Sequence, residues 1–144
     1  GQGNTSSYID LSNYPKYEFG YGLSYSTFEY SNLTLSSDKM KSDEKLVATV
    51  IIKNTGKYAG EEIVHLYLRD VVSSIVRPVK ELKDFKKIAL KAGESKTITF
   101  NIDREKLSFY NQQLKRVAEP GDFDLMIGAS SKDIRLTDKF ELVN

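Results

Sequence analysis

The sequence predicts an all-β domain built as a sandwich of two sheets. From residue 27 onward, short runs rich in Val, Ile, Phe and Thr are separated by turn signals, and no stretch shows the sustained 3.6-residue apolar stripe of a helix. The chain has 144 residues, which suits one domain that buries about 70% of the surface its unfolded chain exposes. Its 40% hydrophobic and 28% charged residues lie in the ordinary globular range, so we expect a packed core.

The first 26 residues differ from the rest of the chain. They are rich in Gly, Ser, Asn and Tyr without a sustained period, and Pro15, Gly20 and Gly22 interrupt them. We therefore divide the chain into a lead-in segment, residues 1–26, and a sandwich domain, residues 27–144.

Two strands with alternating apolar residues are expected before residue 70. The first, 46–52, places four residues on one face: Leu46, Ala48, Val50 and Ile52. Asn54-Thr55-Gly56 then forms a turn that tolerates positive φ. The second strand, 62–69, points Val64, Leu66 and Leu68 inward, and the two-residue alternation places Ile63, His65 and Tyr67 on the outer face.

The middle of the chain predicts a hairpin. Residues 80–90 form an extended segment, Ala92-Gly93-Glu94 turns the chain, and residues 96–102 alternate with Ile98, Phe100 and Ile102 on one side.

Two further strands complete the domain. Pro120-Gly121 opens a strand that points Phe123, Leu125 and Ile127 inward, and residues 135–143 form the last strand after a loop at 129–131. About seven short antiparallel strands fit an immunoglobulin-like or fibronectin type III-like two-sheet sandwich, with a closed barrel as the alternative. Neither architecture specifies a function.

Charge and cysteine content exclude several classes of function. The 21 basic and 20 acidic residues are interspersed and give a net charge of +1, so we expect neither a nucleic acid nor a membrane as partner. Without cysteine there are no disulfides and no thiolate metal sites, which is compatible with the cytosol, the periplasm or secretion.

No apolar run approaches the roughly 20 residues of a membrane span, and the first residues lack the pattern of a signal peptide. We expect a processed chain or a piece of a longer one.

Isolated polar residues predict neither a metal nor a cofactor. His65 is the single histidine, and without a second histidine or a cysteine to complete a ligand set it is expected to pack or lie exposed on the sheet. Gly20-Tyr21-Gly22 lacks the third glycine and the strand-to-helix context of a dinucleotide site, so these glycines are expected to turn the backbone.

A series of motifs follows one another along nearly the whole chain from about residue 14. They are Phe19-Gly20-Tyr21-Gly22-Leu23-Ser24-Tyr25, Thr27-Phe28-Glu29-Tyr30, Asn54-Thr55-Gly56, Gly60-Glu61-Glu62-Ile63-Val64-His65-Leu66-Tyr67-Leu68-Arg69-Asp70, Arg77-Pro78-Val79-Lys80-Glu81-Leu82-Lys83-Asp84-Phe85-Lys86-Lys87-Ile88, Leu90 with Gly93-Glu94-Ser95, Leu107-Ser108-Phe109-Tyr110, Glu119-Pro120-Gly121-Asp122-Phe123 and Ile127-Gly128. In this order they resemble the fibronectin type III-like C-terminal domain of family 3 glycoside hydrolases. The chain departs from the usual pattern at His65, Asp84 and Asn111.

The resemblance implies a domain without an active site of its own. Enzymes of this family that carry the module hydrolyse terminal β-glucosides or β-xylosides with retention. Their nucleophile is an aspartate in an N-terminal (β/α)8 barrel, and the acid/base is usually a glutamate in a following α/β domain. Both domains lie upstream of this module and are its expected partners. The family's nucleophile commonly lies in a Ser-Asp-Trp motif, but this chain has no tryptophan and its Ser37-Asp38 precedes Lys39 in an expected loop. The resemblance also implies a bacterial periplasmic or secreted location.

The residues themselves also predict no catalytic pair. A retaining glycosidase needs two carboxyl groups about 5 to 5.5 Å apart with different protonation states. Asp122 and Asp124 come closest, about 6.6 Å apart by strand rise, but they share the face opposite Phe123 and Leu125, which is expected to be a solvated polar face.

A cluster of aromatic residues is the candidate functional feature. Stacked aromatic rings can fill a domain interface or bind sugars. We expect the lead-in segment to pack on the upstream catalytic domains, and the interface candidates are Tyr14, Tyr17, Phe19, Tyr21 and Tyr25, with Phe28 and Tyr30 continuing the pattern. The alternatives are a carbohydrate-binding module and a stand-alone structural or adhesion sandwich.

Overall fold

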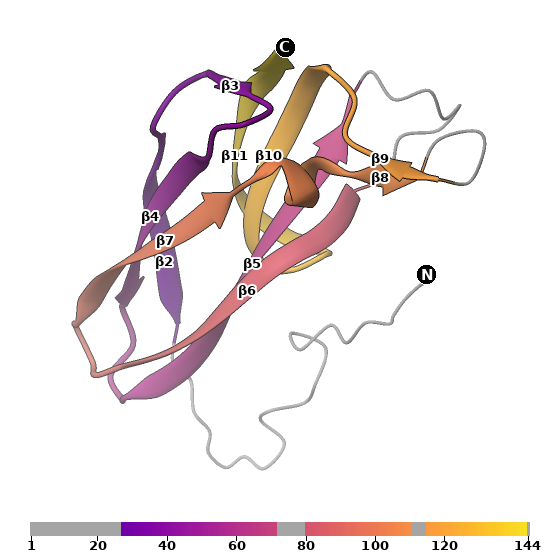
Figure 1. Ribbon diagram of the computed structural model, residues 1–144. Helices are drawn as coiled ribbons and strands as arrows, with labels where there is room; N and C mark the ends of the chain where they lie inside the picture. Colours follow the sequence, from indigo (N-terminus) through magenta and orange to yellow (C-terminus); the bar gives the residue numbers. More distant parts are fainter. Residues whose placement is uncertain (1–26, 72–79, 111–114, 144) are drawn as a thin grey trace.

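The computed structural model describes residues 27–71, 80–110 and 115–143, and they form a β-sandwich (Figure 1). Its elements in chain order are β2 (Phe28–Leu35), β3 (Lys39–Lys41), β4 (Leu46–Asn54), β5 (Gly60–Asp70), β6 (Lys80–Leu90), β7 (Ser95–Ile102), the 3₁₀ helix η3 (Arg104–Leu107), β8 (Phe109–Tyr110), β9 (Arg116–Val117), β10 (Gly121–Ser130) and β11 (Asp133–Val143). One sheet has the strand order β3-β11-β10-β5-β6, the other β2-β4-β7, and β8 and β9 form a small ribbon. The predicted all-β sandwich is confirmed.

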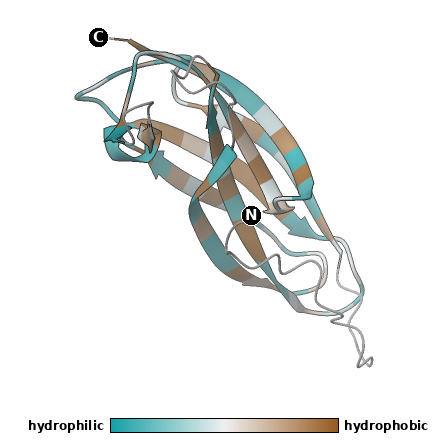
Figure 2. Cartoon of the chain, turned by 90° about the vertical axis from the view of Figure 1, so that its right-hand side faces the viewer, coloured by the Kyte–Doolittle hydropathy of each residue, from teal (hydrophilic) through white to brown (hydrophobic). Residues whose placement is uncertain are grey.

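The core lies between the inner faces of the two larger sheets. Figure 2 shows hydrophobic bands alternating with hydrophilic ones along the strands. The predicted inward residues of each strand are all buried: Leu46, Ala48, Val50, Ile52, Val64, Leu66, Leu68, Ile98, Phe100, Ile102, Phe123, Leu125 and Ile127. Phe123 stacks on Phe140 with ring centroids 5.5 Å apart, which joins β10 to β11 inside the core.

The predicted hairpin of residues 80–102 is wrong. β6 pairs with β5 in the five-stranded sheet, whereas β7 pairs with β4 in the three-stranded sheet. The turn between them crosses the sandwich because the end of β4 holds it. The amide of Gly93 donates to the Asn54 carbonyl at 2.8 Å, and the Asn54 amide donates to the Glu94 carbonyl at 2.9 Å.

The turn after β4 is present as predicted, but it does not use a left-handed backbone. Asn54 is fully buried, and its side-chain oxygen accepts a hydrogen bond from the Gly56 amide at 2.9 Å. Its side-chain amide donates to the carbonyls of Tyr58 and Leu90 at 2.8 and 3.0 Å. The asparagine side chain therefore closes the turn and ties it to β6.

One strand pair departs from the predicted antiparallel pattern. β3 pairs with β11 in parallel, with Lys39 opposite Glu141 and Lys41 opposite Val143. A parallel pair needs a long connection between its strands, and here the connection runs through most of the domain.

Polar groups join the two sheets where β2 lies beside β11. The Tyr30 hydroxyl donates to Glu62 Oε2 at 2.8 Å, and the Arg135 guanidinium lies 4.9 Å from the centroid of the Tyr30 ring. Arg135 also donates to the Phe28 carbonyl at 3.0 Å and pairs with Asp133 at 2.6 Å. Burial, and next the Glu62 carboxylate, raise the pKa of Tyr30 far above its usual value, so the hydroxyl remains a donor.

Candidate functional site

The predicted interface residues fall partly outside the structure. Tyr14, Tyr17, Phe19, Tyr21 and Tyr25 lie outside the described residues. The two aromatic residues that continue their pattern belong to the sandwich instead. Tyr30 is buried, and Phe28 is partly buried against the core. β2 thus uses these two side chains for packing within the sandwich, and the aromatic interface of the lead-in segment stays a prediction.

Asp122 and Asp124 have different surroundings. Asp122 is exposed, as predicted for a solvated face. The side chain of Asp124 is only 13% exposed, and its Oδ2 lies 2.6 Å from an Arg69 nitrogen. Arg69 lies directly opposite Asp124 on β5. Asp124 is thus a member of a cross-strand ion pair.

His65 lies on the side of the sheet that the alternation predicts, away from the core, but it is only 4% exposed. Its ring is parallel to that of Tyr67, with centroids 5.9 Å apart. No group of three or more His, Cys, Asp or Glu side chains within the described ranges could hold a metal ion. The expected packing role of His65 fits this arrangement.

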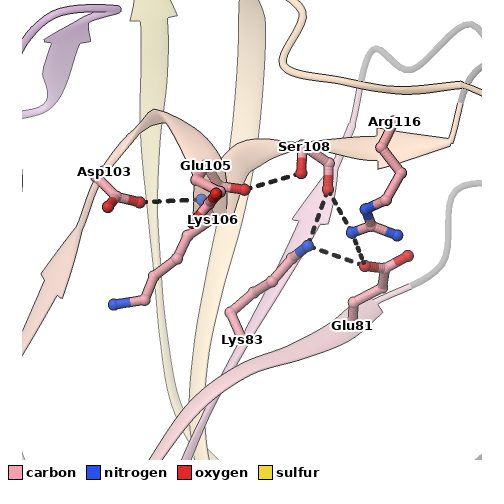
Figure 3. Close-up of polar contacts among 7 residues, drawn as sticks. All are labelled: Glu81, Lys83, Asp103, Glu105, Lys106, Ser108 and Arg116. Carbon is pink, nitrogen blue, oxygen red and sulfur yellow. Dashed lines mark hydrogen bonds and ion pairs between the residues drawn. The ribbon is translucent and has the colours of Figure 1, made fainter.

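A network of charged groups joins β6 to the segment between η3 and β9 (Figure 3). Lys83, whose side chain is 7% exposed, donates to Glu81 Oε1 and to the Ser108 carbonyl, both at 2.9 Å. Arg116 on β9 reaches the same two acceptors at 3.0 and 2.9 Å. The Lys83 ammonium also lies 4.3 Å from the centroid of the Phe109 ring. We call Glu81, Lys83, Ser108 and Arg116 the polar seam.

Burial and charge oppose one another in the polar seam. Burial alone would raise the pKa of Glu81, but the hydrogen bonds from Lys83 and Arg116 outweigh it and hold this pKa below its usual value. Burial lowers the pKa of Lys83, and the Glu81 carboxylate only partly offsets that effect. The seam therefore consists of a carboxylate between two cations, which is a structural contact and not an acid/base pair.

Local hydrogen bonds fix the position of the seam. Asp103 caps η3, because its side chain accepts from the Lys106 amide at 3.1 Å. The Lys106 ammonium pairs with Asp84 on β6 at 3.2 Å and also donates to the Asn101 carbonyl. The Ser108 hydroxyl donates to the Glu105 carbonyl at 2.8 Å. The chain between β7 and β8 is thereby held against β6.

The outer face of the five-stranded sheet is unusually apolar, which the expected alternation of apolar and polar residues does not predict. Tyr67 and Met126 lie opposite each other on neighbouring strands and are 3% and 7% exposed. Leu82, also opposite Tyr67, is 37% exposed, and Phe85, opposite His65, is 59% exposed. We call this surface the apolar outer face, and it comprises Ile63, His65, Tyr67, Val71, Leu82, Phe85 and Met126. The uninterrupted run Ile63–Leu68 was the available signal, because a strand buried on both faces lacks alternation.

No described helix is both long and apolar enough to cross a membrane.

Comparisons with known proteins identify relatives of this chain. A family model described as the fibronectin type III-like domain matches residues 62–131. The chain is 52% identical over 139 residues to a periplasmic β-glucosidase of Salmonella typhimurium, and the match covers 96% of this chain and 18% of that protein. It is 48% identical over 130 residues to Beta-glucosidase BoGH3A of Bacteroides ovatus and 45% identical over 130 residues to a putative β-xylosidase of Formosa agariphila. Each of these two matches covers 90% of this chain and 17% of the relative.

Solved structures agree with these relatives. A β-glucosidase from Listeria innocua, in complex with laminaribiose, matches with a TM-score of 0.73 and 47% identity over 88% of this chain and 17% of that one. A β-D-glucoside glucohydrolase from Trichoderma reesei matches with a TM-score of 0.70 and 37% identity over 93% of this chain and 21% of that one. The chain spans less than a fifth of the length of the curated relatives named above. Residues 62–131 thus match the fibronectin type III-like domain, and nearly the whole chain is similar to the corresponding part of β-glucosidases and of a putative β-xylosidase.

Proposed function

We propose that this chain is the non-catalytic C-terminal accessory domain of a family 3 β-glucosidase and that it stabilises the catalytic domains of that enzyme. One observation carries the proposal: the match to a β-glucosidase covers 96% of this chain but only 18% of the relative. A much larger part of such an enzyme is left to hold the active site. Its proposed partners are the upstream (β/α)8 and α/β domains, and its proposed substrates carry terminal β-D-glucosyl residues.

The polar groups described above support an accessory role. A retaining glycosidase needs one carboxyl group that is protonated and one that is ionised, close together beside a sugar-sized space. Asp124 pairs with Arg69, Glu81 lies between Lys83 and Arg116, and Asp133 pairs with Arg135. The hydrogen bonds from Lys83 and Arg116 hold the pKa of Glu81 below its usual value, which makes this carboxyl group unsuited to a general acid.

The lead-in segment is the first proposed contact with the catalytic domains. We propose that residues 1–26 connect the sandwich, residues 27–144, to the upstream part of the enzyme. Tyr14, Tyr17, Phe19, Tyr21 and Tyr25 would pack there, because aromatic side chains bury large apolar areas in interfaces. Similarity to a periplasmic enzyme supports a location in the periplasm or outside the cell.

Hydrolysis assays test this function. The 144-residue chain and the full-length product of its gene are assayed side by side with aryl β-glucoside and aryl β-xyloside. We expect activity in the full-length protein alone, with the β-glucoside preferred. Hydrolysis by the 144-residue chain would contradict the accessory role, and a full-length protein inactive on both substrates would contradict the proposed enzyme.

A further inference from the structure

The two sheets of the sandwich have different outer faces. On the three-stranded sheet, the positions turned away from the core are mostly polar, with Ser31 and Thr97 flanking Ile51, and Thr34 and Thr99 flanking Thr49. On the five-stranded sheet, the corresponding positions form the apolar outer face defined above. His65, Tyr67 and Met126 are already buried within this chain. A sheet face that meets only water is normally polar, so the exposed apolar residues Val71, Leu82 and Phe85 indicate where another protein surface packs.

The exposed part of the apolar outer face lies at the edge of its sheet. β6 is the last strand in the five-stranded order, and it carries Leu82 and Phe85, which are 37% and 59% exposed. Val71, just after β5, is 45% exposed. The register explains how both β6 residues point outward although they are three positions apart. A bulge lies between the pairs Leu66 with Asp84 and Tyr67 with Leu82, and Lys83 is the extra residue.

Charged side chains surround this apolar area. Lys80 lies over the Tyr67 ring at 5.6 Å, and Arg69 is 46% exposed although it pairs with Asp124. Lys87 is 62% exposed beside Glu61. An apolar centre with a charged rim is the usual composition of a protein–protein interface.

We propose that the apolar outer face docks on the upstream catalytic region of the same full-length chain, with Phe85 and Leu82 at the centre of the contact. This inference rests on the proposed function. The length of the relatives indicates which surface covers this face. The curated relatives are more than five times as long as the part that this chain matches. A large neighbour on the same chain meets this face at a high effective concentration, whereas a free partner does not.

The first test compares one substitution in two settings. Phe85→Ser is made in the full-length protein and in the 144-residue chain. For the full-length protein we measure the half-life of the folded state at an elevated temperature, and for the 144-residue chain the midpoint of unfolding. Because burying a phenylalanine in an interface is strongly favourable, we expect the half-life of the full-length protein to fall roughly tenfold. The midpoint of the 144-residue chain should not change, because the side chain is already mostly in water there.

Tyr58→Ser is the matched control. Tyr58 is 64% exposed, similar to Phe85, but it lies in the turn after β4 and outside the apolar outer face. The control should leave the half-life of the full-length protein unchanged. Equal losses for the two variants, equal effects of Phe85→Ser in the two settings, or no effect in the full-length protein would each overturn the proposal.

Hydroxyl-radical footprinting measures the same contact without substitution. Oxidation of Phe85 and Leu82 should be at least several-fold slower in the full-length protein than in the 144-residue chain. Equal oxidation would overturn the docking, and so would concentration-dependent protection in the 144-residue chain, which would instead indicate a second copy. The readout needs no enzymatic activity, so failure of the docking and failure of the proposed β-glucosidase activity can be distinguished.

Discussion

A single carboxylate, that of Glu81, stabilises the buried ammonium group of Lys83. This ammonium is almost fully removed from water and depends on Glu81, the Ser108 carbonyl and the Phe109 ring. Removing the only anion in this set leaves a desolvated positive charge, which is costly. Glu81 is therefore the residue of the polar seam whose loss should matter most.

Glu81→Gln should lower the free energy of unfolding by about 1–2 kcal/mol at neutral pH. Because the pKa of Glu81 is depressed in the folded state, the stability it contributes is complete above its ordinary value of 4.5 and is lost as the pH falls below it. The variant should therefore show a flatter decline in stability from pH 5 downward. Urea unfolding of the 144-residue chain across this range measures both effects. Glu105→Gln, at an exposed position of η3, should match the wild type.

At the scale of residues, the alternation predicted on which face of the sheet a side chain lies but not how deeply that side chain is buried. It placed His65 and Asp124 on the face opposite the core, which is correct, but it gave no measure of their burial. The burial of Asp124 depends on Arg69, which lies opposite it in the fold but 55 positions away in sequence. Pairing across strands is a product of register, which the pattern of one strand does not contain.

The junction of β10 and β11 depends on one glycine. The register shifts at Gly128, where β11 comes unusually close. A Cβ atom on Gly128 would lie 2.3 Å from the Asp133 carbonyl oxygen and 2.9 Å from the Ile134 Cα. Both atoms are backbone, so relief requires the two strands to separate.

Gly128→Ala should destabilise the domain by about 1–3 kcal/mol, as expected for overpacking against backbone. Denaturant unfolding monitored by circular dichroism measures the loss. Gly93→Asn serves as the comparison, because Gly93 has φ +80° and open space around it, and asparagine tolerates this conformation. A Gly128→Ala variant as stable as wild type would show that the strands separate at little cost.

At the scale of elements, strand positions were predictable and strand partners were not. Residues 80–90 form the expected strand within its expected bounds, but its partner is β5 and not β7. The inward residues of β6 and β7 face each other across the core, and alternation looks the same for strands that face each other and strands that pair. In the observed arrangement, backbone hydrogen bonds at Asn54 hold the turn against the end of β4.

For the whole molecule, the two sheets share one core in which aromatic rings meet. Phe123 is fully buried, stacks on Phe140, and lies 6.2 Å from the Phe109 ring centroid. Phe123→Ala should cost about 3–5 kcal/mol and lower the unfolding midpoint by roughly 10 °C or more, measured by calorimetry. Phe123→Leu, which leaves a smaller cavity, should lose clearly less. A midpoint within about 2 °C of wild type for the alanine variant would contradict the central place of Phe123.

The sandwich as a whole was predictable because its inner faces alternate cleanly, as the buried residues of β4 and β7 show. The candidate surface was not. The aromatic composition of the lead-in segment favoured that segment as the functional surface, whereas Leu82 and Phe85 lie on an edge strand rich in lysine. Their common face depends on the bulge at Lys83, which changes the alternation in the middle of β6.

The parallel pairing of β3 with β11 also sets the order in which the domain folds. β3 ends at Lys41 and β11 begins at Asp133, so this edge of the sheet closes only after nearly the whole domain has left the ribosome. Contacts between such distant segments make sandwiches slow to fold, in milliseconds to seconds. Until β11 arrives, Phe123 and Met40 lack the neighbours that bury them. A nascent chain is therefore exposed to proteases and aggregation until its last strand is made.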